Sequence, residues 1–374
     1  MLKILADENM PYVDQLFGTL GHVQTMAGRE IVAADLVDID ILLVRSITKV
    51  NPQLLAQANK LKFVGSATIG TDHLDIDYLE SNNIKWTNAP GCNATAVAEY
   101  VISALLTLQG RYKLTLHDKT VAIVGAGNIG QRLAKKLTAL KIKHFFCDPP
   151  LARTGATGDF RDIEQVAQAD IISLHVPIIR TGVDKTENLI DRDFLAKLKP
   201  DTIIINSCRG DVINNQDLLQ CLTQGQQLKV VMDVWQHEPE INLDLMALVD
   251  IATPHIAGYS LEGKARGTYM LYQLWCQFNN QAVIKQLNDL LPPSAIKKIW
   301  CDVDTVNTPL VKLVRAVYDI RDDDDLCRAF ATTGHGFDNL RKKYGVRREF
   351  SAVKLASSAE PLPLYLTQLG FTGE

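Results

Sequence analysis

The stretch VAIVGAGNIGQRLAKKL, residues 121–137, decides the fold of this chain. A continuous apolar run leads into three glycines spaced as G-x-G-x-x-G, and an amphipathic segment follows at once. One glycine permits a tight turn, the next lets a pyrophosphate approach the backbone, and the third lets the helix pack closely. We therefore predict a strand, a dinucleotide-binding turn and a helix, with the three glycines at Gly125, Gly127 and Gly130.

The next predicted strand supports this interpretation. It reads HFFCD and ends in Asp148, 18 residues beyond Gly130. An acid at this place can accept hydrogen bonds from the ribose hydroxyls of the adenosine, and its charge repels the 2′-phosphate of NADP. The pattern therefore predicts NAD as the cofactor. The alternative is a glycine turn in an α/β sheet without a cofactor, with Asp148 as a surface residue.

Short apolar runs alternate with helix-like segments on both sides of this motif, which is typical of parallel sheets with crossover helices. Residues 94–109 are almost wholly apolar and predict a long helix where one domain gives way to the next. We predict an α/β fold with two doubly wound parallel-sheet domains of Rossmann-like or flavodoxin-like kind. The predicted strands are KILAD, DILLVRS, LKFVGSAT and IKWTNAP in the first sheet, and TVAIVGAG, KHFFCDP, ADIISLHVP, TIIINSCRG, KVVMDVW and VDIATPH in the second.

The rhythm changes after about residue 284. An amphipathic run, LVKLVRAVY, precedes four acids, Asp322–Asp325, and a basic run, RKKYGVRREF, comes later. Asp is favoured near helix starts, so the acids predict a cap or the residues just before a helix. We expect residues 284–374 to form a small third domain of α+β type.

Composition narrows the class of protein. The chain has 374 residues and is 47% hydrophobic, which is enough for two or three packed domains. Thirty-nine basic and 43 acidic residues give a net charge of −4 without a basic stripe, so we expect no nucleic-acid partner. No apolar stretch is long enough for a signal peptide or a membrane span, so we expect a cytoplasmic protein with no membrane partner. Seven widely separated cysteines without a C-x-x-C pair indicate reduced thiols, with neither disulfides nor a metal site.

Three polar residues follow predicted strands of the second sheet, where parallel sheets bind their ligands. They are Arg209, Glu238 and His255. An Arg can clamp a carboxylate through two hydrogen bonds, and a His can move a proton near neutral pH if a carboxylate orients it. This set is sufficient to oxidise a 2-hydroxy acid. Each residue has a structural alternative, and His237 and His175 remain rival bases.

Several ordered motifs resemble the D-2-hydroxyacid dehydrogenase family over residues 1 to about 283. The resemblance rests on VGAGNIG, NSCRG, DVW with EPE, TPHIAG, and PGCNATAVAEY at the predicted long helix. It implies that Arg209 binds the substrate carboxylate, that Glu238 orients the histidine, and that His255 is the proton donor. Further cofactor contacts that it implies are Asn128, Ile129, Asp148, Ser207, Cys208, Asp233 and Gly258.

The resemblance also has consequences for substrate and assembly. Finer details, including ADENMPY, VRSITKVN, GTDHLD and HIAGYSLEGKARGT, are similar to a branch of the family that acts on a phosphorylated 2-hydroxy acid. In that branch Ser46, Thr68 and Tyr259 match substrate-binding positions. The implied domains are a substrate-binding lid of residues 1–97 completed by 258–283, an NAD-binding domain of 98–257, and a C-terminal domain of 284–374 that forms a homodimer.

Two other classes share these features. Another family member, such as one that acts on 3-phosphoglycerate, would have the same NAD site and the same three polar residues. A non-catalytic NAD-sensing regulator could use the same fold, although loss of one of the three residues or a long disordered tail would be expected of it. The chain has neither feature.

Overall fold

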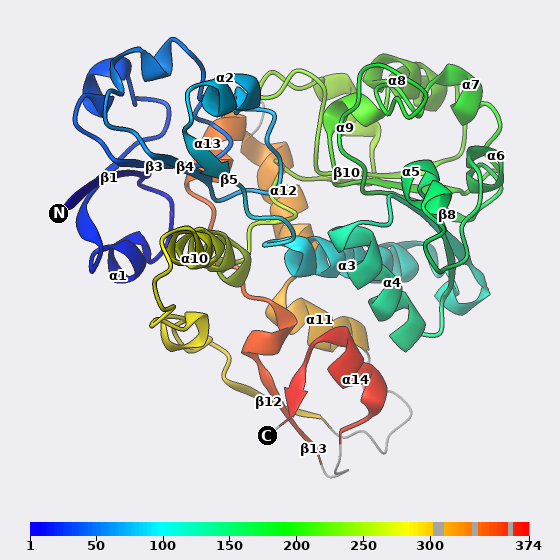
Figure 1. Cartoon of the computed structure of the whole chain (residues 1–374). Coiled ribbons are helices and arrows are strands. Elements are labelled where there is room, and N and C mark those ends of the chain that lie inside the picture. The colour runs from blue at the N-terminus through cyan, green and yellow to red at the C-terminus, as the bar shows by residue number, and fades with distance from the viewer. Residues whose placement is uncertain (302–309, 331–335, 358–361, 374) are drawn as a thin grey trace. The chain divides into compact units, whose positions relative to one another are not determined.

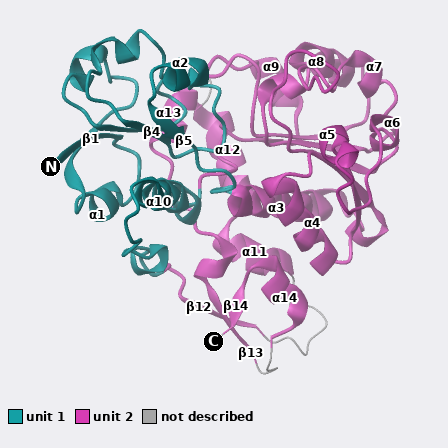
Figure 2. Cartoon of the chain, viewed as in Figure 1, with its two compact units in different colours: residues 1–93, 260–293 teal, residues 94–259, 294–374 magenta. Residues whose placement is uncertain are grey.

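The computed structural model describes residues 1–301, 310–330, 336–357 and 362–373. It divides the chain into two compact units, which Figure 2 distinguishes by colour. Unit 1 contains residues 1–93 and 260–293, and unit 2 contains residues 94–259 and 294–374. Each unit is built round a parallel sheet, so the α/β class with two doubly wound sheets is confirmed.

Unit 1 has a five-stranded parallel sheet in the order β2-β1-β3-β4-β5. Apolar side chains of its central strands are buried on both faces, because helices and turns cover the sheet from both sides. The sequence missed β2, whose residues GHVQTM are half polar, as an edge strand allows. The strands are β1 (Leu2–Asp7), β2 (Gly21–Met26), β3 (Ile41–Val44), β4 (Phe63–Ser66) and β5 (Lys85–Thr87), and the helices are α1 (Val13–Phe17), α2 (Ile76–Ser81) and α10 (Leu261–Phe278).

Helix α10 belongs to unit 1 although it lies far along the chain. Its residues Leu271, Tyr272, Trp275 and Cys276 are buried in the same core as the first strands. Trp275 packs edge-on against Phe63 of β4, with ring centroids 5.4 Å apart. The chain therefore returns to unit 1 after it has completed the sheet of unit 2.

Unit 2 has a six-stranded parallel sheet in the order β11-β10-β9-β8-β6-β7. The long helix α3 and helix α4 cover one face, and α7, α8 and α9 cover the other (Figure 1). All six strands were predicted from the sequence. They are β6 (Thr120–Val124), β7 (Lys143–Cys147), β8 (Ile171–Leu174), β9 (Ile203–Asn206), β10 (Lys229–Met232) and β11 (Ile251–Ala252), and the helices are α3 (Ala94–Tyr112), α4 (Asn128–Ala139), α5 (Pro149–Arg153), α6 (Ile163–Val166), α7 (Arg192–Leu195), α8 (Asn215–Thr223) and α9 (Leu243–Leu248).

The tail has its own small parallel sheet, in the order β12-β13-β14, and its described residues include four α-helices. Its core side chains are continuous with those of α3 and α4, so the described residues from 294 onward pack within unit 2. The small C-terminal domain with its own sheet and mixed helix and strand content is confirmed, and its described residues are grouped with unit 2. Its elements are β12 (Lys298–Cys301), α11 (Leu310–Val317), α12 (Ile320–Phe330), α13 (Gly336–Lys342), β13 (Lys354–Ser357), α14 (Leu364–Leu369) and β14 (Thr372–Gly373).

The predicted domain boundaries differ slightly from the two units, and residues 302–309, 331–335, 358–361 and 374 of the predicted third domain lie outside the described residues. The acids Asp322–Asp325 neither cap nor precede a helix, because α12 begins at Ile320 and includes them. Two of them, Asp323 and Asp324, are buried and bonded. In the part of the chain that the structure describes, no helix has the length and hydropathy that a membrane crossing requires.

Candidate active site

The glycine turn between β6 and α4 has the geometry that its spacing predicts. Gly125 has φ of 99°, and a Cβ there would lie 2.4 Å from the carbonyl oxygen of His175. A Cβ on Gly130 would lie 2.1 Å from the carbonyl oxygen of Gly125, whereas one on Gly127 would meet no described atom within 4 Å. Packing therefore requires the outer two glycines, while the middle one leaves open backbone surface at the start of α4, as a pyrophosphate needs.

Asp148 organises this turn. Its Oδ2 accepts a hydrogen bond from the N–H of Ala126 (2.8 Å), and its Oδ1 accepts one from the N–H of Leu151 (3.0 Å) at the start of α5. One carboxylate thus ties the glycine turn to the end of β7 and caps the next helix. Its contact with a ribose stays a prediction.

The surroundings of the turn fit a dinucleotide. The turn follows β6 and His175 follows β8, and between these strands the sheet order reverses, which is where open α/β sheets bind nucleotides. Two buried polar atoms at the ends of the neighbouring strands β8 and β9, His175 Nδ1 and Ser207 Oγ, have no hydrogen-bond partner among the described residues. A buried group without a partner costs about 1–3 kcal/mol, so a bound ligand would relieve this cost. A cavity of about 520 Å³ adjoins the start of α4 and is lined by Thr95, Gly127, Asn128, Gln131, Arg132, Lys135, Lys136 and Gln368.

The other predicted cofactor contacts lie on the same edge of this sheet or beside it. Cys208 is buried after β9, and burial raises the pKa of its thiol to about 11, so it is a packing residue and not a nucleophile. Ile129 is half-buried in the first turn of α4, and Gly258 lies in the loop after β11. Their contacts with NAD stay predictions.

His255 and Glu238 form a hydrogen-bonded pair. His255 Nδ1 lies 2.7 Å from Glu238 Oε2, and Glu238 Oε1 accepts from the N–H of Trp235 at 2.9 Å. Burial opposes ionisation of Glu238, but the charge and hydrogen bond of His255 outweigh it and lower the pKa of this carboxyl. Glu238 is therefore a carboxylate at neutral pH and stabilises an imidazolium at His255. Because Nδ1 is engaged, the nitrogen left for a substrate is Nε2.

Asp233, the residue that follows β10, holds the loop that carries His255 through hydrogen bonds. Asp233 Oδ1 accepts from Thr253 Oγ1 and from the N–H of Ile256, both at 2.7 Å, and Oδ2 accepts from the N–H of Ala257 at 3.0 Å. The N–H of His255 donates to the carbonyl of Asp233 at 2.7 Å. Burial raises the pKa of Asp233, against these hydrogen bonds and the charge of His255. The Asp233 carboxylate accepts these hydrogen bonds from the chain itself, and its contact with NAD stays a prediction.

Arg209 follows β9 and precedes a short 3₁₀ turn, Gly210–Val212. Its Nη1 donates to the carbonyl of Cys208 at 2.8 Å, and its own carbonyl accepts from Asn206 Nδ2 at 3.0 Å. Strands β9, β10 and β11 are neighbours and parallel. Arg209, Glu238 and His255 therefore all follow the carboxyl ends of adjacent strands, and lie at one edge of the sheet.

The two rival histidines have other surroundings. Burial lowers the pKa of His175 to about 3, and its Nε2 lies 2.8 Å from Ser173 Oγ, so this ring stays neutral and is a weak base. His237 is exposed in the loop after β10. His255 is the histidine held against a carboxylate at the sheet edge, which favours it as the base.

The predicted substrate residues belong to different units. In unit 1, Ser46 follows β3 and Thr68 follows β4, which are adjacent parallel strands. Thr68 Oγ1 lies 2.8 Å from Ser66 Oγ and donates to the carbonyl of Gly70 at 3.2 Å. Tyr259 belongs to unit 2, where its ring packs edge-on against Tyr344 and under the guanidinium of Arg341.

Two cations of unit 1 lie close to each other, and one of them directly precedes Ser46 in the chain. The pKa of Lys264, in the first turn of α10, is lowered to about 8 by burial and then by the charge of Arg45. Arg45 directly precedes Ser46 in the chain. A third cation, Arg266, donates to the carbonyl of Cys92 and is engaged with the backbone. Arg45 and Lys264 thus concentrate positive charge where a phosphate would gain from it.

Sequence reasoning missed several residues that support the site. Thr253 bonds Asp233, and its place two residues before His255 is a signal that could have been used. The others come from the tail: Asp324 accepts from the N–H of Ala252, and Arg347 donates to the carbonyl of Ala257. A separation of 72 or 90 residues gives no local pattern that would reveal such contacts.

Comparison with known proteins agrees with this geometry. Residues 102–257 match the family described as D-isomer specific 2-hydroxyacid dehydrogenase, NAD binding domain, and residues 290–370 match a domain of unknown function, DUF3410. The chain is 52% identical over 373 residues to an erythronate-4-phosphate dehydrogenase of Shewanella baltica (strain OS185). The alignment covers all of this chain and 99% of the relative. It is 49% identical to the enzyme of that name from Shewanella amazonensis, with 99% of each chain covered.

Solved structures give the same fold. NAD-bound 3-phosphoglycerate dehydrogenase of Entamoeba histolytica has a TM-score of 0.64 at 25% identity, over 78% of this chain and 99% of that one. An NAD-dependent formate dehydrogenase of Staphylococcus aureus in complex with NAD has a TM-score of 0.61 at 22% identity, over 76% of this chain and 98% of that one. The sheet of unit 2 is thus an NAD-binding domain, and NAD is the cofactor.

The glycines allow a paired test of the nucleotide turn. Gly127→Ala should leave the free energy of unfolding nearly unchanged but raise the Kd for NAD roughly tenfold or more, about 1.4 kcal/mol, because the methyl group occupies the open backbone surface. Gly130→Ala should lower the free energy of unfolding by about 1–3 kcal/mol, because its methyl group meets the Gly125 carbonyl. Calorimetric titration and urea unfolding measure the two effects, and an unchanged Kd for Gly127→Ala would contradict this account of the turn.

Proposed function

The chain belongs to the erythronate-4-phosphate dehydrogenases, within the D-2-hydroxyacid dehydrogenase family, and on that premise we propose that it oxidises 4-phospho-D-erythronate at C2 with NAD. The product is the 2-oxo acid, (R)-3-hydroxy-2-oxo-4-phosphooxybutanoate. The reaction belongs to the biosynthesis of pyridoxal 5′-phosphate, vitamin B6. The observation that carries the proposal is the His255–Glu238 pair with Arg209, on the carboxyl ends of three adjacent strands.

Each of the three side chains has one task. Arg209 binds the substrate carboxylate through its guanidinium, whose planar fork matches two carboxylate oxygens. His255 Nε2 takes the proton of the C2 hydroxyl, and the imidazolium that results is stabilised by the carboxylate of Glu238 at Nδ1. In the reverse direction the same nitrogen returns the proton. The chemistry moves one proton to the protein for each hydride that leaves C2.

NAD, when bound, supplies the acceptor for that hydride. The chain would hold it by Gly125, Gly127, Asn128, Ile129 and Gly130 at the pyrophosphate, Asp148 at the ribose, and Ser207, Cys208, Asp233 and Gly258 near the nicotinamide. Support for this set comes from the open surface at Gly127 and from the unpartnered hydroxyl of Ser207. The remaining residues of the set rest on the resemblance.

We propose that residues of unit 1 bind the phosphate of the substrate. Arg45 and Lys264 are close enough for the charge of one to lower the pKa of the other, and an anion between them would remove this repulsion. Ser46 and Thr68 offer hydroxyls on the ends of neighbouring strands, and Tyr259 offers a phenol from unit 2. We assign these five residues to the substrate, with the phosphate nearest the two cations.

The proposal extends to assembly and location. Residues 284–374 would mediate a homodimer, and the protein would act in the cytoplasm. The named relatives are matched over the whole chain, tail included, which supports a tail that belongs to the enzyme and is not an appended regulator. Light scattering on the full chain and on a chain ending near residue 284 would test the dimer.

A substrate panel tests the function. We expect NAD reduction with 4-phosphoerythronate, and a loss of most of kcat/KM with unphosphorylated erythronate, because an unmade charged hydrogen bond costs on the order of 1–3 kcal/mol. The measurement is the initial rate at 340 nm for each compound at matched concentration. Equal turnover of erythronate, or a clear preference for 3-phosphoglycerate in competition, would refute the substrate while leaving a dehydrogenase mechanism.

Lys264 gives a pH test of the phosphate site. A lysine is charged below its pKa, so with a pKa of about 8 the free protein loses this charge as pH rises past 8, and KM for the phosphorylated substrate should rise there. Lys264→Gln should raise KM on the order of tenfold at pH 7 and abolish this rise. Lys49→Gln, an exposed lysine of the same unit, is the matched control. An identical pH dependence of KM in Lys264→Gln would argue against a phosphate contact.

A further inference from the structure

The loop that carries His255 is fixed from two directions within unit 2. Asp233 holds it from the sheet, through Thr253, Ile256 and Ala257. The tail holds it from the other side, since Asp324 of α12 accepts from the N–H of Ala252 at 2.8 Å, just before the loop begins. His255 itself has φ of 57°, a left-handed conformation that is uncommon in residues other than glycine.

Arg347 makes the tail's direct contact with this loop. It lies between α13 and β13, its side chain is buried, and its Nη1 donates to the carbonyl of Ala257 at 3.0 Å. Its Nη2 donates to the carbonyl of Ala96 in α3 at 2.7 Å. One guanidinium therefore joins the loop of the catalytic histidine to the central helix of the unit.

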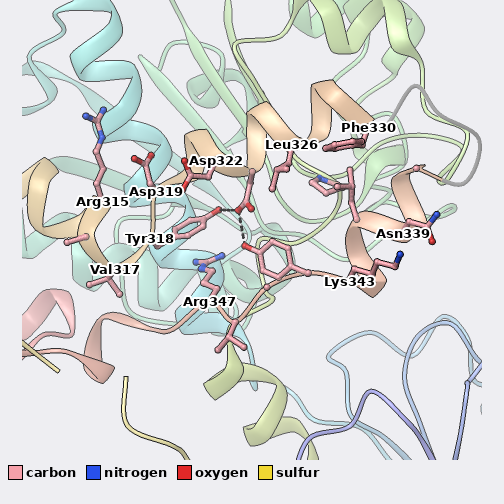
Figure 3. Close-up of a pocket in the computed structure, with 18 residues that line it drawn as sticks. Arg315, Val317, Tyr318, Asp319, Asp322, Leu326, Phe330, Asn339, Lys343 and Arg347 are labelled. Atoms are coloured by element: carbon pink, nitrogen blue, oxygen red, sulfur yellow. Dashed lines mark hydrogen bonds between the residues drawn. The ribbon is translucent and has the colours of Figure 1, made fainter. Parts of the chain in front are cut away.

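The guanidinium packs on an aromatic ring, which an acid holds in place. It lies over the ring of Tyr318, with 3.5 Å between Cζ and the ring centroid. The hydroxyls of Tyr318 and Tyr344 both donate to Asp323 Oδ2, at 2.8 and 2.9 Å, which Figure 3 shows as dashed lines beside Arg347. These groups border a cavity of about 730 Å³ that also reaches Pro254, the residue before His255.

The same cluster reaches the loop by a second route. The ring of Tyr318 stacks on that of Tyr100, with centroids 6.5 Å apart, and the Tyr100 hydroxyl lies 2.7 Å from Thr253 Oγ1. Thr253 in turn donates to Asp233. The tail thus contacts the histidine loop at the carbonyl of Ala257 directly and at Thr253 through two stacked rings.

We infer that Arg347 is a positioning residue for the reaction: its guanidinium clamps the Ala257 carbonyl to α3 and so keeps His255 against Glu238. The tail then has a part in catalysis besides any part in assembly. The inference rests on the proposed function, because it assumes that His255 moves the proton. It assigns to residues 290–370 a task within the same chain.

The chemistry explains why arginine occupies this place. A planar guanidinium donates to two carbonyls in different directions and keeps its face on an aromatic ring. A lysine ammonium is a compact charge without a planar face, and its shorter reach cannot reproduce both hydrogen bonds. A glutamine can donate to a carbonyl but carries no charge and no fork.

Steady-state kinetics on Arg347→Lys and Arg347→Gln test the inference, with rates expressed per NAD-binding site. We expect kcat to fall roughly 10- to 100-fold, the effect of a misplacement of about 1 Å, with the Kd for NAD within about twofold of wild type. The pH profile for oxidation should also change, because the 2.7 Å contact between the His255 ring and the Glu238 carboxylate would be lost. Arg321→Gln, on the exposed side of α12, is the control and should match wild type.

The outcomes separate the possible failures. A folded variant with wild-type kcat would overturn the inference, and so would a fall in kcat with an unmoved pH profile. If neither variant folds, Tyr318→Leu is judged by the same two readouts. This substitution removes the ring beneath the guanidinium, its stacking on Tyr100 and its hydrogen bond to Asp323. An inactive wild-type enzyme would instead count against the proposed function.

Discussion

The buried carboxylate of Asp233 is the interaction on which the rest of the site depends. It accepts three hydrogen bonds from the loop that follows β11, at Thr253, Ile256 and Ala257. These bonds set the backbone on which His255 adopts its left-handed conformation. Without them the ring would have no fixed direction, and the 2.7 Å contact with Glu238 would compete with many other arrangements. A charge is costly to bury unless it is bonded in this way.

The chain divides the proposed chemistry between parts of its two units. In unit 2, the turn at Gly125–Gly130, tied to Asp148, is the proposed nucleotide surface, and adjacent strand ends carry Arg209, Glu238 and His255, which we propose as the catalytic residues. The tail, which packs on α3 and α4, adds Arg347 and Asp324 to the supports of the same loop. In unit 1, Arg45, Lys264, Ser46 and Thr68 are the residues that we propose for the phosphorylated end of the substrate.

The strands of unit 2 and the glycine turn could be predicted from the sequence, because their structure depends on residues that are close together in the chain. Continuous apolar runs revealed all six strands of unit 2, and glycine spacing revealed the turn, since a Cβ at Gly125 or Gly130 would collide with backbone. Strand β2 was missed because an edge strand needs no apolar run. The supports of the histidine loop were missed for another reason. Arg347 lies in a basic run, a pattern typical of exposed residues. Only the tertiary fold reveals that its side chain is buried and donates to the carbonyl of Ala257, 90 residues earlier in the chain.

The central claim is that His255, oriented by Glu238, moves the proton of the C2 hydroxyl. Single-turnover reduction of NAD by His255→Asn, with the Kd for NAD determined on the same preparation, measures this most directly. Asparagine keeps the side chain polar and of similar width but cannot take up the proton. The account predicts a rate at least about 100-fold below wild type with NAD still bound, the usual contribution of general base catalysis. A rate near that of the wild-type protein, with NAD bound normally, would contradict it.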